Sequence, residues 1–421
     1  MSVSKRQTPA RSTLDDGVSG LSLQDVVLDT AAVSARLHFT GTKTQPLVPP
    51  ISQSSTYILD KVEDFLGSLA DGGSIYSRLS NESAESVECA INALEQGAGS
   101  LVFSSGMGAV SAIFFGFLKT GDHVICQTPA YSGTIDLLKQ MADSFKIEVT
   151  WVKAGGPVED YKKNLKPNTR MMVGETPCNP HMSILDLKAF GELGRSLDNV
   201  LTVVDSTFAS PYLQQAIKFD IDLSMHSCTK YMGGHSDLVA GCVTTRTLDQ
   251  WRRMKKVQGS IGACLSPHDC SLLLRGLKTL PIRMKKHSEN AQRVAEFLSK
   301  HPKVLRVSYP GLPDSPGHEV AKRQMTSFSG MIMADIDGGF DAGKTVAENL
   351  RVAKLAVSLG GVETIVEHVY SMSHGPYLMS AEEIKEADIT PGMLRISIGI
   401  EDAEDLVKDF AQALDKVKIL M

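Results

Sequence analysis

Near its middle the chain reads His226-Ser-Cys-Thr-Lys-Tyr-Met-Gly-Gly-His-Ser-Asp237. Lys230 stands in this stretch directly after two small hydroxyl residues, Ser227 and Thr229, and shortly before a pair of glycines. Most lysines are solvated surface charges. Lys230 differs from them because an apolar segment precedes this stretch and few charged residues surround it. We therefore interpret Lys230 as a functional amine.

A carboxylate lies upstream of this lysine, where Val203-Val-Asp205 reads as a buried strand with an acidic end. Pyridoxal 5'-phosphate (PLP) requires an amine for its Schiff base, a carboxylate facing its pyridinium nitrogen and small hydroxyls around its phosphate. A carboxylate beside the ring nitrogen favours the protonated ring, which then acts as an electron sink. Without Lys230, Asp205 would be explained equally well as a helix cap.

The composition is that of an ordinary globular protein and excludes several classes of partner. The chain has 421 residues, of which 42% are hydrophobic and 22% are charged, so two or three domains with a sizeable core are expected. The net charge of −5 gives no basic surface for nucleic acid. No apolar run approaches the roughly 20 residues of a membrane helix. We expect neither a nucleic-acid nor a membrane partner.

The cysteines and the N-terminus indicate a cytoplasmic protein. The seven cysteines are odd in number and form no Cys-x-x-Cys, which is typical of reduced thiols. Cys264-Leu-Ser-Pro-His268-Asp-Cys270 offers close ligands without an obvious fourth, so no metal site is expected. The polar segment 1–11 lacks the apolar core of a secretion signal. It faintly resembles a transit peptide, but a disordered tail is the preferred interpretation.

Helical and strand patterns alternate from about residue 84. Helical spacing occurs at 84–94, 108–118, 134–142, 186–196 and 209–217. Short apolar segments typical of strands occur at 100–103, 123–127, 147–152, 170–174, 201–204 and 223–226. This alternation predicts an α/β domain with a mostly parallel sheet and helices on both faces.

Three regions follow from these patterns. Residues 1–75 are expected to form an N-terminal arm with an extended segment at 46–57, and residues 76–283 the large domain. A helix at 284–299 leads out of it, and a Pro/Gly-rich turn follows at 311–317. Strand patterns at 330–336 and 394–398 and helical patterns at 343–351 and 403–416 then predict a smaller α+β domain over residues 284–421.

Other candidate ligands lie where predicted strands end. Ser105-Gly106-Met107 separates a strand from a helix, and amides at a helix start favour an anion such as phosphate. It is neither a P-loop nor a dinucleotide fingerprint. Tyr131 follows the strand at 123–127, where ligand sites of α/β proteins lie. It could stack on a planar cofactor or be an ordinary loop tyrosine.

Several motifs in combination make the chain, from about Pro46 to its end, similar to the Cys/Met-metabolism (trans-sulfuration) PLP enzymes. This family includes cystathionine γ-synthase, cystathionine γ- and β-lyases and methionine γ-lyase. The motifs are Tyr76-Ser-Arg78-x-x-Asn81, Ser104-Ser-Gly-Met107, Tyr131-x-Gly-Thr134, Glu175-x-Pro-x-Asn179-Pro180, Val204-Asp205-x-Thr-Phe208, Ser227-x-Thr229-Lys230, Ser358-Leu-Gly-Gly361 and Arg395-x-Ser-x-Gly399-Ile-Glu-Asp402. The resemblance implies a PLP-dependent transferase-like fold (fold type I, aspartate aminotransferase-like), with a mostly parallel seven-stranded sheet and a smaller C-terminal α+β domain.

The resemblance also implies how the cofactor is held. Lys230 would form the Schiff base, Asp205 would pair with the pyridinium nitrogen, and Tyr131 would stack on the ring. The phosphate would be bound by Gly106, Met107, Ser227 and Thr229. Tyr76 and Arg78 would reach the phosphate of a neighbouring subunit, which implies a homo-oligomer, at least a dimer and by family resemblance a dimer of dimers.

The substrate implied by the resemblance is a small amino acid. Its carboxylate would be bound by Asn179, Ser358 and Arg395, and a planar guanidinium suits this task because it can bind a carboxylate through two hydrogen bonds. Without the resemblance, Arg395 could be explained as half of a structural ion pair.

The chain departs from the family pattern at three places. Asn81-Glu82-Ser83 replaces the usual Asn-Pro-Thr, and Tyr131-Ser132-Gly133-Thr134 lacks a cysteine found in many methionine γ-lyases. Val357 stands where cystathionine γ-lyases and γ-synthases have a glutamate that would pair with the distal ammonium of cystathionine. Because Val357 offers an apolar wall instead, a smaller and uncharged substrate side chain is favoured.

The predicted reaction is an α,γ-elimination of methionine or homocysteine that yields a thiol, 2-oxobutyrate and ammonia. The freed Lys230 amine would move the Cα proton, and Tyr131 is a candidate acid for the departing thiol. Cystathionine γ-lyase, β-lyase and γ-synthase activities remain alternatives. An aminotransferase and a non-catalytic scaffold are more distant ones.

Overall fold

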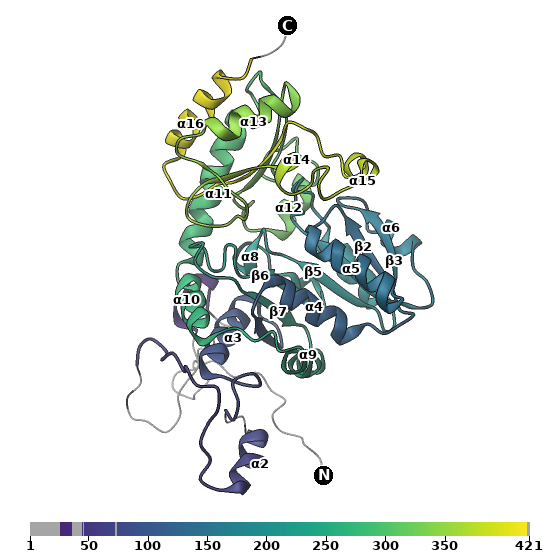
Figure 1. Cartoon of the computed structure of the whole chain (residues 1–421), viewed down its shortest axis with the longest axis vertical. Coiled ribbons are helices and arrows are strands. Elements are labelled where there is room, and N and C mark those ends of the chain that lie inside the picture. The colour runs from purple at the N-terminus through teal and green to yellow at the C-terminus, as the bar shows by residue number, and fades with distance from the viewer. Residues whose placement is uncertain (1–25, 36–43, 45, 72–73, 419–421) are drawn as a thin grey trace.

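The computed structural model describes residues 26–35, 44, 46–71 and 74–418. The predicted tail at residues 1–11 lies outside the described residues. The chain folds into a large α/β part and a smaller C-terminal domain, which lie one above the other in Figure 1.

A seven-stranded sheet forms the centre of the large part, with strand order β1-β7-β6-β5-β4-β2-β3. Its strands are β1 (Gly99–Phe103), β2 (His123–Thr128), β3 (Glu148–Lys153), β4 (Thr169–Glu175), β5 (Leu201–Asp205), β6 (Leu223–Ser227) and β7 (Gly241–Thr245). The run from β6 to β3 is parallel, and β7 is antiparallel to both of its neighbours. The prediction of a mostly parallel sheet is confirmed, and β7 was not predicted.

Helices cover both faces of this sheet. They are α3 (Glu82–Glu95), α4 (Gly106–Phe117), α5 (Ser132–Phe145), α6 (Glu159–Lys163), α7 (Leu187–Arg195), α8 (Ser210–Leu213), α9 (Leu248–Ile261) and α10 (Pro267–Leu277). One buried cluster joins α4, α5 and α9 to the sheet, and another joins α6 and α7 to it. Strands β1, β2 and β4 are buried along nearly their whole length, which explains their mostly apolar sequences, whereas the edge strand β3 is exposed at both ends.

The single helix predicted at 209–217 is wrong. The chain instead forms the short α8 and a 3₁₀ turn, η2 (Ala216–Phe219), separated at Gln214, whose backbone is extended. The buried amide of Gln214 donates to the carbonyl of Thr176 at 2.9 Å and to Ser206 Oγ at 2.8 Å. These tertiary hydrogen bonds hold the residue outside a helix.

The smaller domain contains a five-stranded sheet of order β10-β11-β12-β9-β8. Its strands are β8 (Val304–Ser308), β9 (Met331–Ile336), β10 (Lys354–Leu355), β11 (Ile365–His368) and β12 (Met393–Ser397), and its helices are α11 (Leu280–Leu298), α12 (His318–Gln324), α13 (Gly339–Asn349), α14 (Val369–Met372), α15 (Ala381–Glu386) and α16 (Ala403–Asp415). Helices α11, α13 and α16 share a buried cluster with the sheet. A smaller C-terminal α+β domain is thus confirmed, whereas boundaries at 75/76 and 283/284 stay predictions.

The N-terminal region carries two helices, α1 (Leu28–Ser34) and α2 (Val62–Asp71). Helix α1 packs against α3 and α11, whereas α2 extends away from the large part at the lower end of Figure 1. The described residues of 46–57 contain neither a helix nor a strand, as expected for an extended segment, and Thr56 forms a single bridge with Tyr76. Nowhere in the described chain is a helix both long enough and apolar enough to cross a membrane.

Candidate active site

A cavity of about 370 Å³ lies where the carboxyl ends of the parallel strands face the smaller domain. The predicted cofactor ligands that line it are Gly106, Met107, Tyr131, Asp205, Ser227, Thr229 and Lys230. The predicted substrate ligands that line it are Asn179, Val357, Ser358 and Arg395. Tyr76 and Arg78 do not line it. The fold therefore brings together residues that are far apart in the sequence.

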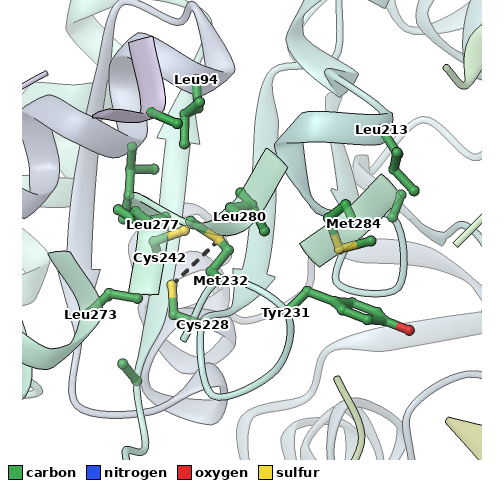
Figure 2. Packing of buried hydrophobic residues seen from close by; sticks show 14 of the residues in the cluster. Leu94, Leu213, Cys228, Tyr231, Met232, Cys242, Leu273, Leu277, Leu280 and Met284 are labelled. Atoms are coloured by element: carbon green, nitrogen blue, oxygen red, sulfur yellow. Dashed lines mark hydrogen bonds between the residues drawn. The ribbon is translucent and has the colours of Figure 1, made fainter. Parts of the chain in front are cut away.

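The segment after β6 presents Lys230 because its neighbours are anchored in the core. Figure 2 shows Cys228, Tyr231 and Met232 packed among buried side chains of the cluster. Cys228 Sγ lies 3.8 Å from Met232 Sδ. With these three side chains buried on one side, Thr229 and Lys230 are directed to the cavity.

Lys230 contacts the loop of the smaller domain that carries Ser358. Its Nζ donates to Ser358 Oγ at 2.5 Å. A glycine at position 360 permits this approach, since a Cβ there would lie 2.6 Å from the backbone nitrogen of Tyr231. Burial, and next the positive charge of Arg395, lower the pKa of Lys230 to about 8. This amine therefore loses its proton more readily than a lysine in water.

Two carboxylates stand side by side at the ends of β4 and β5, where Glu175 and Asp205 are register partners. Asp205 Oδ1 accepts from the backbone N–H of Thr207 at 2.9 Å in the turn after β5. Helix α8 has Ala209 as its N-cap and no side-chain cap, so the interpretation of Asp205 as a helix cap is wrong, and its carboxylate lines the cavity. Burial raises the pKa of Asp205, while its hydrogen bonds with Thr207 oppose the rise. Burial and then the charge of Asp205 raise the pKa of Glu175 to about 8.

The start of α4 forms a cradle suited to an anion. Ser105 caps this helix, and its Oγ accepts from the N–H of Gly108 at 2.9 Å. A Cβ at Gly106 would lie 3.0 Å from Ser227 Cβ and 3.1 Å from its Oγ, so the glycine lets the helix start lie against this side chain without crowding it. Amides at a helix start and a nearby hydroxyl fit a phosphate group. The hydroxyl of Thr229, in contrast, exchanges hydrogen bonds with the backbone of Ala240.

Arg395 lies in a buried polar cluster. Its Nη1 donates to Asn179 Oδ1 at 2.9 Å and its Nη2 to the carbonyl of Ser358 at 3.1 Å. Nη2 also pairs with Glu367, its cross-strand partner on β11. The ion-pair interpretation of Arg395 is therefore correct, and the same guanidinium also lines the cavity. Three of the five N–H donors of this guanidinium are engaged by the protein, which leaves two for a substrate carboxylate.

The sequence did not lead us to four further residues that line the cavity: Glu175, Glu367, Ser373 and His374. Glu175 lies inside a quoted motif, which was the available signal. His374 is buried, and burial followed by the charge of Arg395 lowers its pKa to about 4. Its ring is neutral near pH 7, so it adds no charge to the site.

The remaining predicted residues lie at the edge of the site or away from it. Val357 is 60% exposed at the rim of the cavity, and the ring of Tyr131 lies against Gly133. The Arg78 guanidinium is 5.4 Å from the ring centroid of Tyr76, and its Nη1 donates to the carbonyl of Gly259. Their reach into another subunit stays a prediction. The described residues contain no His/Cys/Asp/Glu group suited to hold a metal ion.

The sequence matches the family described as Cys/Met metabolism PLP-dependent enzyme over residues 29–415. It is 44% identical to an L-methionine gamma-lyase of Fusobacterium nucleatum subsp. polymorphum over 374 residues, 88% of this chain and 94% of the relative. It is 41% identical to a cystathionine gamma-synthase of Mycobacterium bovis, over 87% of this chain and 91% of the relative. The crystal structure of metB from Corynebacterium glutamicum superposes with a TM-score of 0.87 at 38% identity, covering 94% of this chain and 99% of that one. This chain therefore belongs to the Cys/Met metabolism PLP-dependent enzymes.

Proposed function

We propose that this enzyme is a carbon–sulfur lyase that removes the γ-sulfur substituent of methionine or homocysteine. The products are a thiol (hydrogen sulfide in the case of homocysteine), 2-oxobutyrate and ammonia. Val357 carries the proposal, because it places an apolar side chain at the cavity rim. The carboxylates that line the cavity, Glu175, Asp205 and Glu367, already accept hydrogen bonds from the protein. At the rim, a distal ammonium on the substrate would meet the apolar side chain of Val357 instead of an acidic one.

PLP is the cofactor of this family, and when bound it supplies an electron sink for the substrate carbon next to the amino group. We propose that Lys230 bonds to its aldehyde, that Asp205 faces its ring nitrogen and that Tyr131 stacks on its ring. The start of α4, with Gly106 and Met107, would hold the phosphate together with Ser227 and Thr229. The glycine-permitted contact between the helix start and Ser227 supports this arrangement.

The chain's own residues then perform the proton transfers. Lys230 Nζ takes the proton from the substrate Cα, and the lowered pKa of this amine favours its free-base form. Ser358 Oγ orients the amine through its 2.5 Å hydrogen bond. Arg395 and Asn179 hold the substrate carboxylate. Loss of a proton from the substrate Cβ then expels the sulfur from Cγ, and the hydroxyl of Tyr131 gives that sulfur a proton.

Product analysis tests this proposal directly. The holoenzyme is incubated separately with methionine, homocysteine and cystathionine, and thiol, 2-oxobutyrate and ammonia are quantified, with Lys230→Ala as the inactive control. We expect methionine or homocysteine to give all three products and cystathionine to react more slowly. A clear preference for cystathionine would show the Val357 argument to be wrong. Pyridoxamine phosphate would indicate an aminotransferase, and no turnover of any substrate a scaffold.

Cystathionine synthesis is the second candidate, because the 41% identical relative is a cystathionine gamma-synthase. A synthase replaces the γ-substituent instead of eliminating it. Adding cysteine to the same assay separates the two reactions. Cystathionine accumulating at the expense of 2-oxobutyrate would favour the synthase.

We further propose a homo-oligomer, at least a dimer and by family resemblance a dimer of dimers, in which Tyr76 and Arg78 complete the site of a neighbouring subunit. Apolar side chains near α2 support an interface there, since Ile58 is 97% and Val62 86% exposed in the single chain. Mixing inactive Arg78→Ala subunits with inactive Lys230→Ala subunits should restore activity, because some sites would then be intact. Failure of the mixture to recover would contradict a shared site.

We also propose a cytoplasmic location. Cys126, Cys178, Cys228, Cys242 and Cys270 are buried free thiols, as a reducing compartment favours. Fractionation of the cells with an antibody to the protein tests this proposal. Recovery with an organelle or in the secreted fraction would contradict it.

A further inference from the structure

Glu175 is a carboxylate inside the site to which neither the motifs nor the proposed mechanism gives a task. It ends β4, is 6% exposed and lines the cavity. Its Oε2 accepts from the backbone N–H of Tyr131 at 2.8 Å, and its Oε1 accepts from the backbone N–H of Asn179 at 2.7 Å. One buried carboxylate thus binds two separate loops at once.

These two loops carry different parts of the proposed site. Tyr131 begins the segment that leads into α5 and is proposed to stack on the cofactor ring. Asn179 belongs to the loop after β4, and its Oδ1 accepts from Arg395 Nη1 at 2.9 Å. A continuous set of hydrogen bonds therefore runs from Tyr131 through Glu175 and Asn179 to Arg395.

We propose that Glu175 is a positioning residue that fixes the cofactor-stacking Tyr131 and the carboxylate-binding pair of Asn179 and Arg395 relative to each other. The proposal rests on the proposed functions of these residues. Because a carboxylate has two oxygens in one rigid plane, it can set the spacing of two N–H groups. An isolated hydrogen bond to either loop would leave the other free to move.

A purely structural role is the alternative, in which Glu175 only satisfies two buried N–H groups. The chain offers a matched control for it. Asp409 in α16 is also buried, and its carboxylate accepts from the backbone N–H groups of Arg351 at 2.8 Å, Val352 at 2.8 Å and Ala353 at 3.0 Å. Asp409 is on the buried face of α16 in the smaller domain and does not line the cavity.

The test compares the holoenzymes of Glu175→Gln, Glu175→Asp and Asp409→Asn with the wild type. The amide of Gln presents a donor to one of the two N–H groups, and the shorter Asp cannot span both of them. Three dissociation constants are measured from the cofactor absorbance: those of PLP itself, of norleucine and of n-pentylamine. Norleucine has no sulfur to cleave, and n-pentylamine has the same chain without the carboxylate. Melting temperatures report stability.

We expect Glu175→Gln to weaken PLP binding and norleucine binding about tenfold each, as for one lost buried hydrogen bond. The dissociation constant of n-pentylamine should change less than about twofold. Asp409→Asn should lower the melting temperature and leave all three constants within about twofold. If Glu175→Gln does not fold, Glu175→Asp should show the same pattern. The proposal is overturned if PLP or norleucine binding stays within twofold of wild type, or if both amines weaken equally.

A double-mutant cycle examines the route of the effect. If Glu175 acts on the carboxylate through Asn179, the losses in norleucine affinity for Glu175→Gln and Asn179→Ala should not add. Additive losses would overturn this route. These binding measurements do not depend on carbon–sulfur cleavage. If the proposed lyase reaction is wrong, the wild-type enzyme will still bind norleucine but will form no thiol from methionine.

Discussion

Replacing Lys230 with methionine should stabilise the protein stripped of its cofactor, although it abolishes catalysis. The pKa of Lys230 falls from 10.5 to about 8 in the fold, mainly through burial. One pKa unit corresponds to about 1.4 kcal/mol, so burying the protonated amine costs about 3 kcal/mol at neutral pH. Methionine has a similar length and no charge, and it therefore avoids this cost.

The pH dependence distinguishes this cause from simple repacking. Between about pH 8 and pH 10.5 the unfolded chain keeps the lysine proton that the folded protein loses. The unfolded state then binds more protons, so the stability of the wild type rises with pH. Relative to Lys230→Met, we expect the wild type to gain about 2 kcal/mol between about pH 7 and about pH 9.5.

Urea unfolding of both stripped proteins at one protein concentration measures this difference. Other titrating groups are common to the two proteins and cancel in the comparison. An exposed lysine on α9, Lys256, provides the control, and Lys256→Met should show a difference that is flat over the same pH range. A flat difference for Lys230→Met as well would refute the reasoning.

Three further substitutions test the site. Val357→Glu should raise kcat/KM for cystathionine about two- to fivefold, because an exposed ion pair contributes up to about 1 kcal/mol, and it should lower kcat/KM for methionine. If the ratio of the two kcat/KM values is unchanged in a side-by-side assay, Val357 does not determine the substrate. Arg395→Lys cannot form all three contacts that the guanidinium makes with Asn179, Ser358 and Glu367. In steady-state kinetics we expect this variant to raise KM for the amino acid at least tenfold, with a smaller change in kcat. An unaltered KM would show that Arg395 does not bind the substrate carboxylate. Gly360→Ala places a Cβ 2.6 Å from the nitrogen of Tyr231 at a residue with φ of 79°, so the loop should shift and the melting temperature fall; a melting temperature equal to that of the wild type would contradict this close approach.

The elements that sequence reasoning found share one property, namely a strong local pattern. The buried parallel strands are continuous apolar runs, and the helices between them have clear spacing. Helix α9 was missed although Thr247 with Gln250 forms a capping box. The start of α10 carries a similar signal, because Ser266 caps this helix just before Pro267. These start signals were available in the sequence and would have located both helices.

The strand β7 was harder to find, because its sequence Gly-Cys-Val-Thr-Thr is short and only moderately apolar. Its place between β1 and β6 depends on pairing with strands from distant parts of the chain. The break in the predicted helix at 209–217 has the same kind of cause, since the side chain of Gln214 is bound by residues that are distant in sequence. Local propensity does not contain such information.

By itself, the sequence determined the chemistry of the chain: the lysine with its adjoining hydroxyls, the acidic strand end and the family to which they belong. Those residues lie within short motifs, so their chemical roles can be inferred from the sequence alone. Only the tertiary structure decided what surrounds them. It placed Glu367 opposite Arg395, brought Ser358 to the amine of Lys230 and set Glu175 between two loops. These contacts join strands and loops separated along the chain. The burial that shifts the pKa values of Lys230 and Glu175 therefore exists only once the chain has folded.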